Sequence, residues 1–170
     1  MNAQLKDVQT ILPMQVSQLP EVLVVERRAY EFPWTDTILK DCLKAGYSAW
    51  VLADSDGVLI GHALMSMAVD EAHVLNLCVD PSQQRRGLGL KLLNHLMTIA
   101  RAANASIVLL EVRKSNKAAL RLYESVGFQR IGVRKAYYPA KDGREDALAL
   151  GFAIRWAPTP PAVARNSPGR

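Results

Sequence analysis

The chain has few of the features that mark secreted, membrane-bound or metal-stabilised proteins. Its 170 residues include only two cysteines, Cys42 and Cys78, which lie in apolar stretches without metal-ligand spacing. We therefore expect reduced, buried thiols rather than disulfides. No apolar run approaches the roughly 20 residues of a membrane span, and the first seven residues lack the basic-then-apolar pattern of a secretion signal. These absences predict a cytoplasmic protein without a membrane partner.

Metal-binding and nucleic-acid-binding signals are also missing. The three histidines, His62, His73 and His95, have no ligand spacing, so we expect no metal. The basic residues are scattered and accompany no recognised nucleic-acid-binding motif, so no direct nucleic-acid contact is expected.

Charge is distributed unevenly along the chain. Residues 1–80 hold 5 Lys+Arg against 11 Asp+Glu, whereas residues 81–170 hold 16 against 5, and the overall net charge is +5. This division predicts an anionic ligand on the C-terminal half and a cationic one near the N-terminal half. A surface distribution without functional meaning is the alternative.

Apolar periodicity and turn residues predict strands that alternate with helices. Strands are expected at residues 8–14, 48–53, 58–69, 72–79, 107–112, 129–138 and 147–156. Helices are expected at residues 19–29, between the cap Thr35 and Gly46, along the apolar stripe that begins at Leu88, and at residues 116–126 with Ser115 as the cap.

Hairpins early in the chain and a crossover later predict an α/β fold. We expect a mixed, mostly antiparallel sheet of about six to seven strands with helices on both faces. Residues 1–156 would form one domain, and the Pro- and Ala-rich residues 157–170 a disordered tail.

A glycine-containing segment is the most informative feature of the chain. It follows an apolar strand and opens a helix, so its backbone amides and the helix dipole would favour phosphate oxygens. Walker A loops need a Lys-Ser/Thr pair after the last glycine, and dinucleotide-binding loops need a third glycine where this chain has Leu92. The segment therefore predicts a phosphate-bearing coenzyme other than ATP or NAD, and its residues are Gln84, Arg85, Arg86, Gly87, Leu88 and Gly89.

Two side chains stand out chemically. Glu111 interrupts an apolar strand and shares a sheet face with Ile107 and Leu109, where desolvation would favour its use as a general base. The alternative is a strand-end carboxylate paired with Arg113 or Lys114. Tyr123 lies seven positions after Asn116, about two helical turns, so both would project from one helix face. Core packing is the alternative for Tyr123.

Together these segments resemble the GNAT acetyltransferase superfamily. The resemblance is carried by the strand at residues 75–79, the glycine segment, Leu110 to Arg113, Ser115-Asn116 and the run from Leu122 to Phe128. The segments at residues 28–34, 137–139 and 143–147 are similar to those of the bacterial ribosomal-protein-alanine N-acetyltransferases. The resemblance runs from about residue 8 to residue 154.

The resemblance implies a GNAT fold with a splayed central strand pair and acetyl-CoA as co-substrate. It implies that Glu111 accepts a proton, that Tyr123 donates one, and that the acceptor is the N-terminal alanine of small-subunit ribosomal protein eighteen. The coenzyme would contact Leu77, Cys78 and Val79, residues 84–89, and Asn116. Cys78 stands at a position where alanine is common among members of this superfamily. We do not expect Cys78 to be a nucleophile.

Two other functions stay open at this point. The same chemistry could act on a lysine side chain, another N-terminus or a small polyamine. The chain could also be an acetyl-CoA-binding module without catalysis, although Glu111 and Tyr123 together favour an enzyme.

Overall fold

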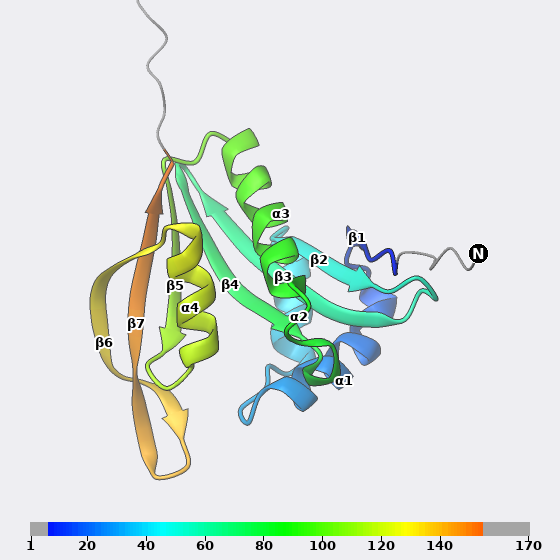
Figure 1. The fold of residues 1–170 in the computed structure, drawn as a ribbon, viewed down its shortest axis with the longest axis horizontal. Helices are drawn as coiled ribbons and strands as arrows, with labels where there is room; N and C mark the ends of the chain where they lie inside the picture. Colours follow the sequence, from blue (N-terminus) through cyan, green and yellow to red (C-terminus); the bar gives the residue numbers. More distant parts are fainter. Residues whose placement is uncertain (1–6, 155–170) are drawn as a thin grey trace, which may run out of the picture.

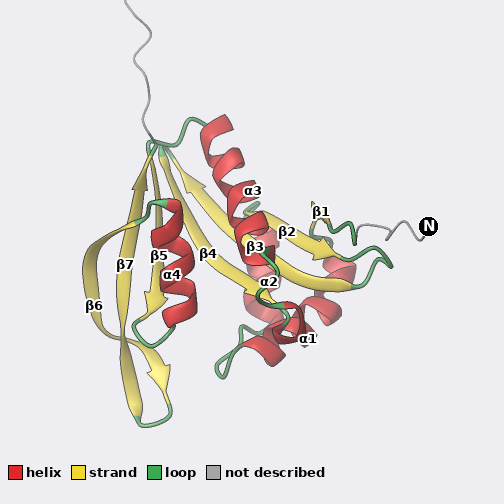
Figure 2. Cartoon of the chain, viewed as in Figure 1, coloured by secondary structure: helices red, strands yellow, loops and turns green. Residues whose placement is uncertain are grey.

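The computed structural model describes residues 7–154, whose strands all belong to one seven-stranded sheet (Figures 1 and 2). The chain forms β1 (Thr10–Pro13), α1 (Leu19–Ala29), α2 (Asp36–Lys44), β2 (Ser48–Ala53), β3 (Leu59–Ala68), β4 (Glu71–Val79), α3 (Leu88–Ala102), β5 (Ile107–Arg113), α4 (Lys117–Val126), β6 (Gln129–Ala140) and β7 (Gly143–Ala153). Short 3-10 turns lie at Val16–Gln18 and Pro81–Gln83.

The sheet confirms the predicted mixed, mostly antiparallel architecture. Its strand order is β1-β2-β3-β4-β5-β7-β6, and β4 with β5 is the parallel pair among the described residues. The crossover between these two strands contains α3, as a parallel connection requires.

Helices cover both faces of the sheet. The core on one face joins α3 and α4 to side chains such as Leu52, Met65 and Leu110. The core on the other face joins α1 and α2 to Val51 and Leu64. The alternation of adjacent residues such as Val51 and Leu52 between the two cores follows from the period of two along a strand.

The sheet opens between its two central strands. Parallel pairing runs from Glu71 with Ile107 to Val74 with Leu110 and then stops. In Figure 1 the two strands lie side by side at one end and diverge toward the other. The predicted splayed strand pair is therefore present, and it leaves the last residues of β4 unpaired on the side of β5.

A β-bulge lies where the two strands separate. Leu64 of β3 pairs with Asn76 and Met65 pairs with Val74, so Leu75 is an extra residue in β4. One extra residue reverses the alternation of side chains beyond it. Ala72 and Val74 therefore belong to the α3 core, whereas Cys78 belongs to the α1 core.

Most element boundaries lie within two residues of the prediction, and two differences have a clear physical cause. The cap of α4 is Asn116, whose side chain accepts the Ala119 N–H, and not Ser115. β7 begins at Gly143, four residues before the predicted start, because the chain turns back at Lys141 and Asp142. The predicted tail at residues 157–170 and the predicted strand end at Trp156 lie outside the described residues. No helix within residues 7–154 is long and apolar enough to span a bilayer.

Gly61 provides a test of the contact between β3 and β4. A Cβ at this position would lie 2.9 Å from the carbonyl oxygen of Cys78, which is a backbone atom that cannot rotate away. We expect Gly61→Ala to lower the free energy of unfolding by about 1–3 kcal/mol, the usual cost of overpacking. Urea denaturation measures this change.

Gly132→Ala in β6 is the matched control, because its Cβ would meet its nearest neighbour, Ala149 Cβ, at 4.0 Å. It should change the free energy of unfolding by less than about 0.5 kcal/mol. Equal stability of the two variants would mean that β4 can move away from Gly61 freely.

Candidate active site

The backbone of β4 presents polar groups to the gap between β4 and β5. The Asp80 N–H donates to the Ile60 carbonyl of the β3 side at 2.8 Å. Backbone hydrogen-bonding groups alternate in direction along a strand. The backbone N–H and C=O of Cys78 therefore also point to β3, whereas those of Leu77 and Val79 point into the gap. Of the three predicted β4 contacts, Leu77 and Val79 therefore have backbone groups directed toward a ligand in the gap, and Cys78 lies between them.

The glycine segment lies at the start of α3, beside the end of β4. Gly87 is the N-cap residue with φ of 76°, and no side chain caps this helix. By contrast, Thr35 caps α2 and Asn116 caps α4. The first-turn amides of α3 therefore lack a side-chain acceptor, which makes this helix end a suitable site for phosphate oxygens.

The residues around Gly87 have different roles. Gly87 itself has open space, since a Cβ there would meet nothing within 4 Å, whereas a Cβ on Gly89 would lie 3.3 Å from Leu122 of α4. Gly89 thus also permits the close approach of two helices. Arg85 and Arg86 are exposed, and the Arg86 guanidinium contacts Asp7 and Gln83.

Asn116 is held in one orientation at the start of α4. Its Oδ1 accepts the Ala119 N–H at 3.1 Å. Its Nδ2 has no hydrogen-bond partner within residues 7–154, so this amide could donate to a ligand. Because Asn116 precedes the helix, its predicted spacing from Tyr123 on one helix face is only approximate.

Glu111 lies just beyond the point where β5 leaves β4. Its carboxylate is half-buried and pairs through Oε1 with Arg134 Nε at 2.9 Å. This partner comes from β6, not from the sequence neighbours Arg113 or Lys114. Arg113 instead pairs with Glu145 at 3.3 Å. Within the described part of the chain, Glu111 Oε2 accepts no hydrogen bond and is left to interact with a substrate.

Tyr123 approaches from α4 and is 7% exposed. Its ring packs edge-on against Phe128, with 5.8 Å between the ring centroids. Burial raises the pKa of the Tyr123 hydroxyl well above its usual value of 10. The side chain therefore packs in the core and also carries a proton that it retains at neutral pH.

Glu111 and Tyr123 belong to opposite faces of the sheet. Leu110 and Val112 lie in the core with Tyr123, so the intervening Glu111 points to the other face. The strand gap next to Glu111 is the place where groups from both faces can approach one ligand.

A cation between two aromatic rings connects the two sides of this region. The Arg113 guanidinium lies 5.5 Å from the ring centroid of Phe32 and 4.5 Å from that of Tyr138. The Tyr138 hydroxyl donates to the Glu111 carbonyl at 3.1 Å. Burial and the neighbouring charges of Tyr137 and Glu111 raise the pKa of Tyr138 to about 12. The loop at residues 30–35 and strand β6 therefore form two linked walls next to Glu111.

A buried polar cluster that the sequence analysis did not identify lies behind the gap. Glu26 is 1% exposed and its carboxylate accepts hydrogen bonds from the Trp34 backbone, His62 Nε2 and Asn76 Nδ2. Because an ionised carboxylate only accepts, His62 Nε2 carries the proton in this pair. Burial opposes the charge on Glu26, but these hydrogen bonds and His62 outweigh it and lower the pKa of the carboxyl.

Three residue types that bind metals meet in this cluster. Donor atoms of Glu26, His62 and Cys78 lie within 4.8 Å of one another. However, both carboxylate oxygens already accept hydrogen bonds, and burial raises the pKa of the Cys78 thiol far above its usual value of 9. The protonated thiol is a poor ligand and a poor nucleophile. The absence of a metal stays a prediction.

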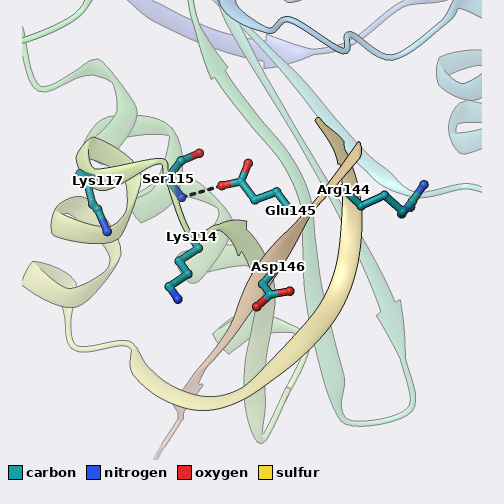
Figure 3. A pocket seen from close by; sticks show the side chains of 6 residues that line it. All are labelled: Lys114, Ser115, Lys117, Arg144, Glu145 and Asp146. Carbon is teal, nitrogen blue, oxygen red and sulfur yellow. Dashed lines mark hydrogen bonds between the residues drawn. The ribbon is translucent and has the colours of Figure 1, made fainter. Parts of the chain in front are cut away.

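A shallow hollow of about 420 Å³ lies between the β5–α4 loop and the start of β7 and contains none of the predicted site residues. Figure 3 shows Glu145 turned toward the backbone N–H of Ser115, at 2.8 Å, with Lys114 and Lys117 nearby. This contact fixes the loop that leads from β5 to Asn116. The hollow is lined by Lys114, Ser115, Lys117, Arg144, Glu145 and Asp146.

The lowered pKa of Glu26 predicts acid sensitivity. A carboxyl whose pKa falls below its usual 4.5 on folding stabilises the fold fully above about pH 4.5 and loses that contribution as the pH falls further. We expect the slope of unfolding free energy against pH between about 5 and 3 to be smaller in Glu26→Gln than in the unmodified chain. Chemical denaturation at each pH measures it.

The control is Glu21→Gln, which removes a carboxyl from the exposed side of the same helix. It leaves Glu26 in place, so the contribution of Glu26 to the slope should remain. An unchanged slope in Glu26→Gln would show that this carboxyl has no net coupling to folding.

Comparison with known proteins adds independent information about this chain. The model of the acetyltransferase (GNAT) family matches residues 14–128. The chain is 38% identical over 145 residues to the ribosomal protein bS18-alanine N-acetyltransferase of Escherichia coli (strain K12), covering 85% of this chain and 97% of that protein. It is 42% identical over 110 residues to the N-alpha-acetyltransferase RimI of Mycobacterium tuberculosis, covering 62% of this chain and 68% of that protein.

The fold is also similar to solved structures. The crystal structure of the ribosomal-protein-S18-alanine N-acetyltransferase from Escherichia coli superposes with a TM-score of 0.82 at 37% identity, covering 88% of this chain and 96% of that chain. Ard1 from Thermoplasma volcanium superposes with a TM-score of 0.79 at 24% identity, which compares the fold alone.

Proposed function

This chain belongs to the acetyltransferase (GNAT) family and is an acyltransferase, and we propose that it acetylates the N-terminal alanine of ribosomal protein bS18 in the cytoplasm. The observation that carries the proposal is the gap between β4 and β5, with Glu111 next to it and Tyr123 on the opposite face of the sheet. The name of the relative whose length the chain covers to 97% supports the choice of acceptor.

Acetyl-CoA, the acetyl donor that this family uses, would lie in the gap. The backbone N–H groups of Leu77 and Val79 would pair with an extended amide-bearing arm, since the two carbonyls already accept hydrogen bonds from Tyr30 and Gln84. Cys78 holds the strand against β3. The uncapped start of α3, with Gln84, Arg85, Arg86, Gly87, Leu88 and Gly89, would accept the pyrophosphate. The Nδ2 of Asn116 would donate a hydrogen bond to the extended amide-bearing arm of the coenzyme.

Glu111 is the proposed base. A peptide α-amine has a pKa of about 7.7–8.0, so a large part is protonated near neutral pH and cannot attack a thioester. Glu111, with Oε1 bound by Arg134, would accept that proton through Oε2, directly or by way of a water. The Val79 N–H, which faces the gap, is a suitable donor for the developing oxyanion.

Tyr123 is the proposed acid. As the amine attacks the acetyl carbonyl, the carbon–sulfur bond breaks and the departing thiolate takes the phenolic proton. A phenol has a pKa of about 10 and a thiol a pKa of about 8.5, so proton transfer from tyrosine to the thiolate is unfavourable in water. Burial of Tyr123 makes the hydroxyl still less acidic, and the transfer therefore has to accompany the development of charge on sulfur.

The acidic N-terminal half and the paired aromatic walls suit a peptide acceptor. Phe32 and Tyr138 enclose the Arg113 guanidinium beside Glu111, so an entering peptide would lie across Arg113, along the loop at residues 30–35 and β6. These walls support a protein N-terminus over a small polyamine, which would need no extended channel.

The first test is mass spectrometry of a synthetic peptide that begins Ala-Arg after incubation with acetyl-CoA. We expect one acetyl group on the α-amine, and we expect Glu111→Gln to lower kcat by about 10²–10⁴-fold, the usual contribution of a general base. Glu124→Gln is the matched control, because Glu124 also pairs with an arginine, at 2.7 Å, but lies on the exposed side of α4. Full activity in Glu111→Gln, or acetylation of polyamines alone, would contradict the proposal.

The second test separates the role of Tyr123 in proton transfer from packing. Tyr123→Phe should lower kcat at least about tenfold and leave the Kd of acetyl-CoA nearly unchanged, because the ring still fills its place. Because the raised pKa keeps the hydroxyl protonated, kcat of the unmodified enzyme should not fall between about pH 8 and 10 through this group. Tyr47→Phe, which removes an exposed hydroxyl, is the control. Equal losses of turnover and coenzyme affinity would instead assign Tyr123 to packing or binding.

A further inference from the structure

Glu26 of α1 holds together three other segments of the chain. Its Oε1 accepts the backbone N–H of Trp34 at 2.9 Å, and its Oε2 accepts His62 Nε2 at 2.8 Å and Asn76 Nδ2 at 3.0 Å. Trp34 lies in the loop between α1 and α2, His62 in β3 and Asn76 in β4. One buried charge therefore links a surface loop to the two strands beneath it.

The Glu26 carboxylate binds β4 at the point where this strand separates from β5. Asn76 is the first paired residue after the bulge at Leu75, where β4 has just separated from β5. The carboxylate thus connects the loop to the part of β4 whose other side would face the acetyl donor. Glu26 itself is buried and cannot touch the acceptor, so any effect on the reaction must act through its partners in the loop and in the strands.

Loss of the loop contact would be unfavourable. A carboxylate out of water depends on its hydrogen-bond donors, and removing one donor leaves part of a buried charge without a partner. Loop positions in which the Trp34 N–H moves away from Glu26 are therefore disfavoured. This constraint acts on the backbone, so it is independent of the side chains that the loop exposes.

The loop that Glu26 holds carries two side chains that reach the reaction region. The Tyr30 hydroxyl donates to the Leu77 carbonyl at 2.6 Å, at the edge of the gap. The Phe32 ring lies over the Arg113 guanidinium, where the acceptor peptide is proposed to bind. A shift of the loop backbone would move both of these side chains.

We propose that Glu26 is a positioning residue that fixes the loop at residues 30–35 as one wall of the acceptor channel. It sets the affinity for the acceptor peptide much more than the affinity for acetyl-CoA, because the predicted pyrophosphate site at α3 lies on other elements and, among the described residues, the loop contacts the donor side only through Tyr30 and the Leu77 carbonyl. This inference rests on the proposed function, since the channel is defined by an N-terminal peptide acceptor.

Steady-state kinetics of Glu26→Gln test the proposal. An amide cannot accept all three hydrogen bonds, so the loop should loosen. We expect the KM of the Ala-Arg peptide to rise at least about fivefold while the Kd of acetyl-CoA changes less than about twofold. Glu26→Asp keeps the charge on a shorter side chain and should show the same split at smaller amplitude. This conservative variant provides the comparison if Glu26→Gln does not fold.

Backbone hydrogen exchange of the Trp34 amide, without any substrate, tests the anchor directly. Exchange should be at least about tenfold faster in Glu26→Gln than in the unmodified chain, and unchanged in Glu21→Gln. If the unmodified chain acetylates no Ala-Arg peptide, the proposed function fails, but this exchange measurement still tests whether Glu26 holds the loop.

Three outcomes would overturn the inference. They are an unchanged peptide KM in folded Glu26→Gln, equal weakening of peptide and acetyl-CoA binding, and Trp34 exchange that matches the unmodified chain. A lower melting temperature alone would make Glu26 a stabilising core residue without a role in acceptor binding.

Discussion

The extra residue in β4, Leu75, is the constraint on which the site depends. Parallel pairing with β5 ends one residue before it, and the side chains beyond it point to reversed faces. Without the reversal, the Asn76 amide would point into the apolar core beneath α3 rather than toward Glu26. The single extra residue therefore lies where the gap begins. Beyond it, the backbone amides of β4 point into the gap and the Asn76 side chain points toward α1.

The two sides of the gap use different chemistry. The side formed by β4 and α3 offers mainly backbone groups and a helix end. These groups are present whatever the side chains are, provided that position 87 is glycine. The side formed by the loop at residues 30–35 and β6 uses Phe32, Arg113 and Tyr138. Donor recognition should consequently tolerate substitution better than acceptor recognition, because backbone contacts do not depend on the identity of the side chain.

Sequence reasoning succeeded where a feature depends on near neighbours. The strand face of Glu111, the helix that begins at Leu88 and the cap at Thr35 all follow from local periodicity and turn chemistry. The predicted start of β7 is four residues too late, although Asp142-Gly143 is a hairpin signal that would have placed a turn before residue 147. Choosing Asn116 over Ser115 as a cap requires the backbone dihedrals, since both residue types cap helices. The pairing of Glu111 with Arg134, and the gathering of Glu26, His62 and Asn76, depend on strand register and on contacts 23 to 50 positions apart, which no local pattern encodes.

These long separations have a kinetic consequence for the Glu26 cluster. The carboxylate meets His62 and Asn76 across 36 and 50 positions of chain, whereas the bond from Trp34 spans only 8. Contacts between distant segments require closure of large loops and therefore form slowly. Until β3 and β4 have paired, Glu26 has only the nearby amide as a partner, and the acceptor wall has no fixed platform. A nascent chain should thus fix the loop at residues 30–35 only after β3 and β4 have paired.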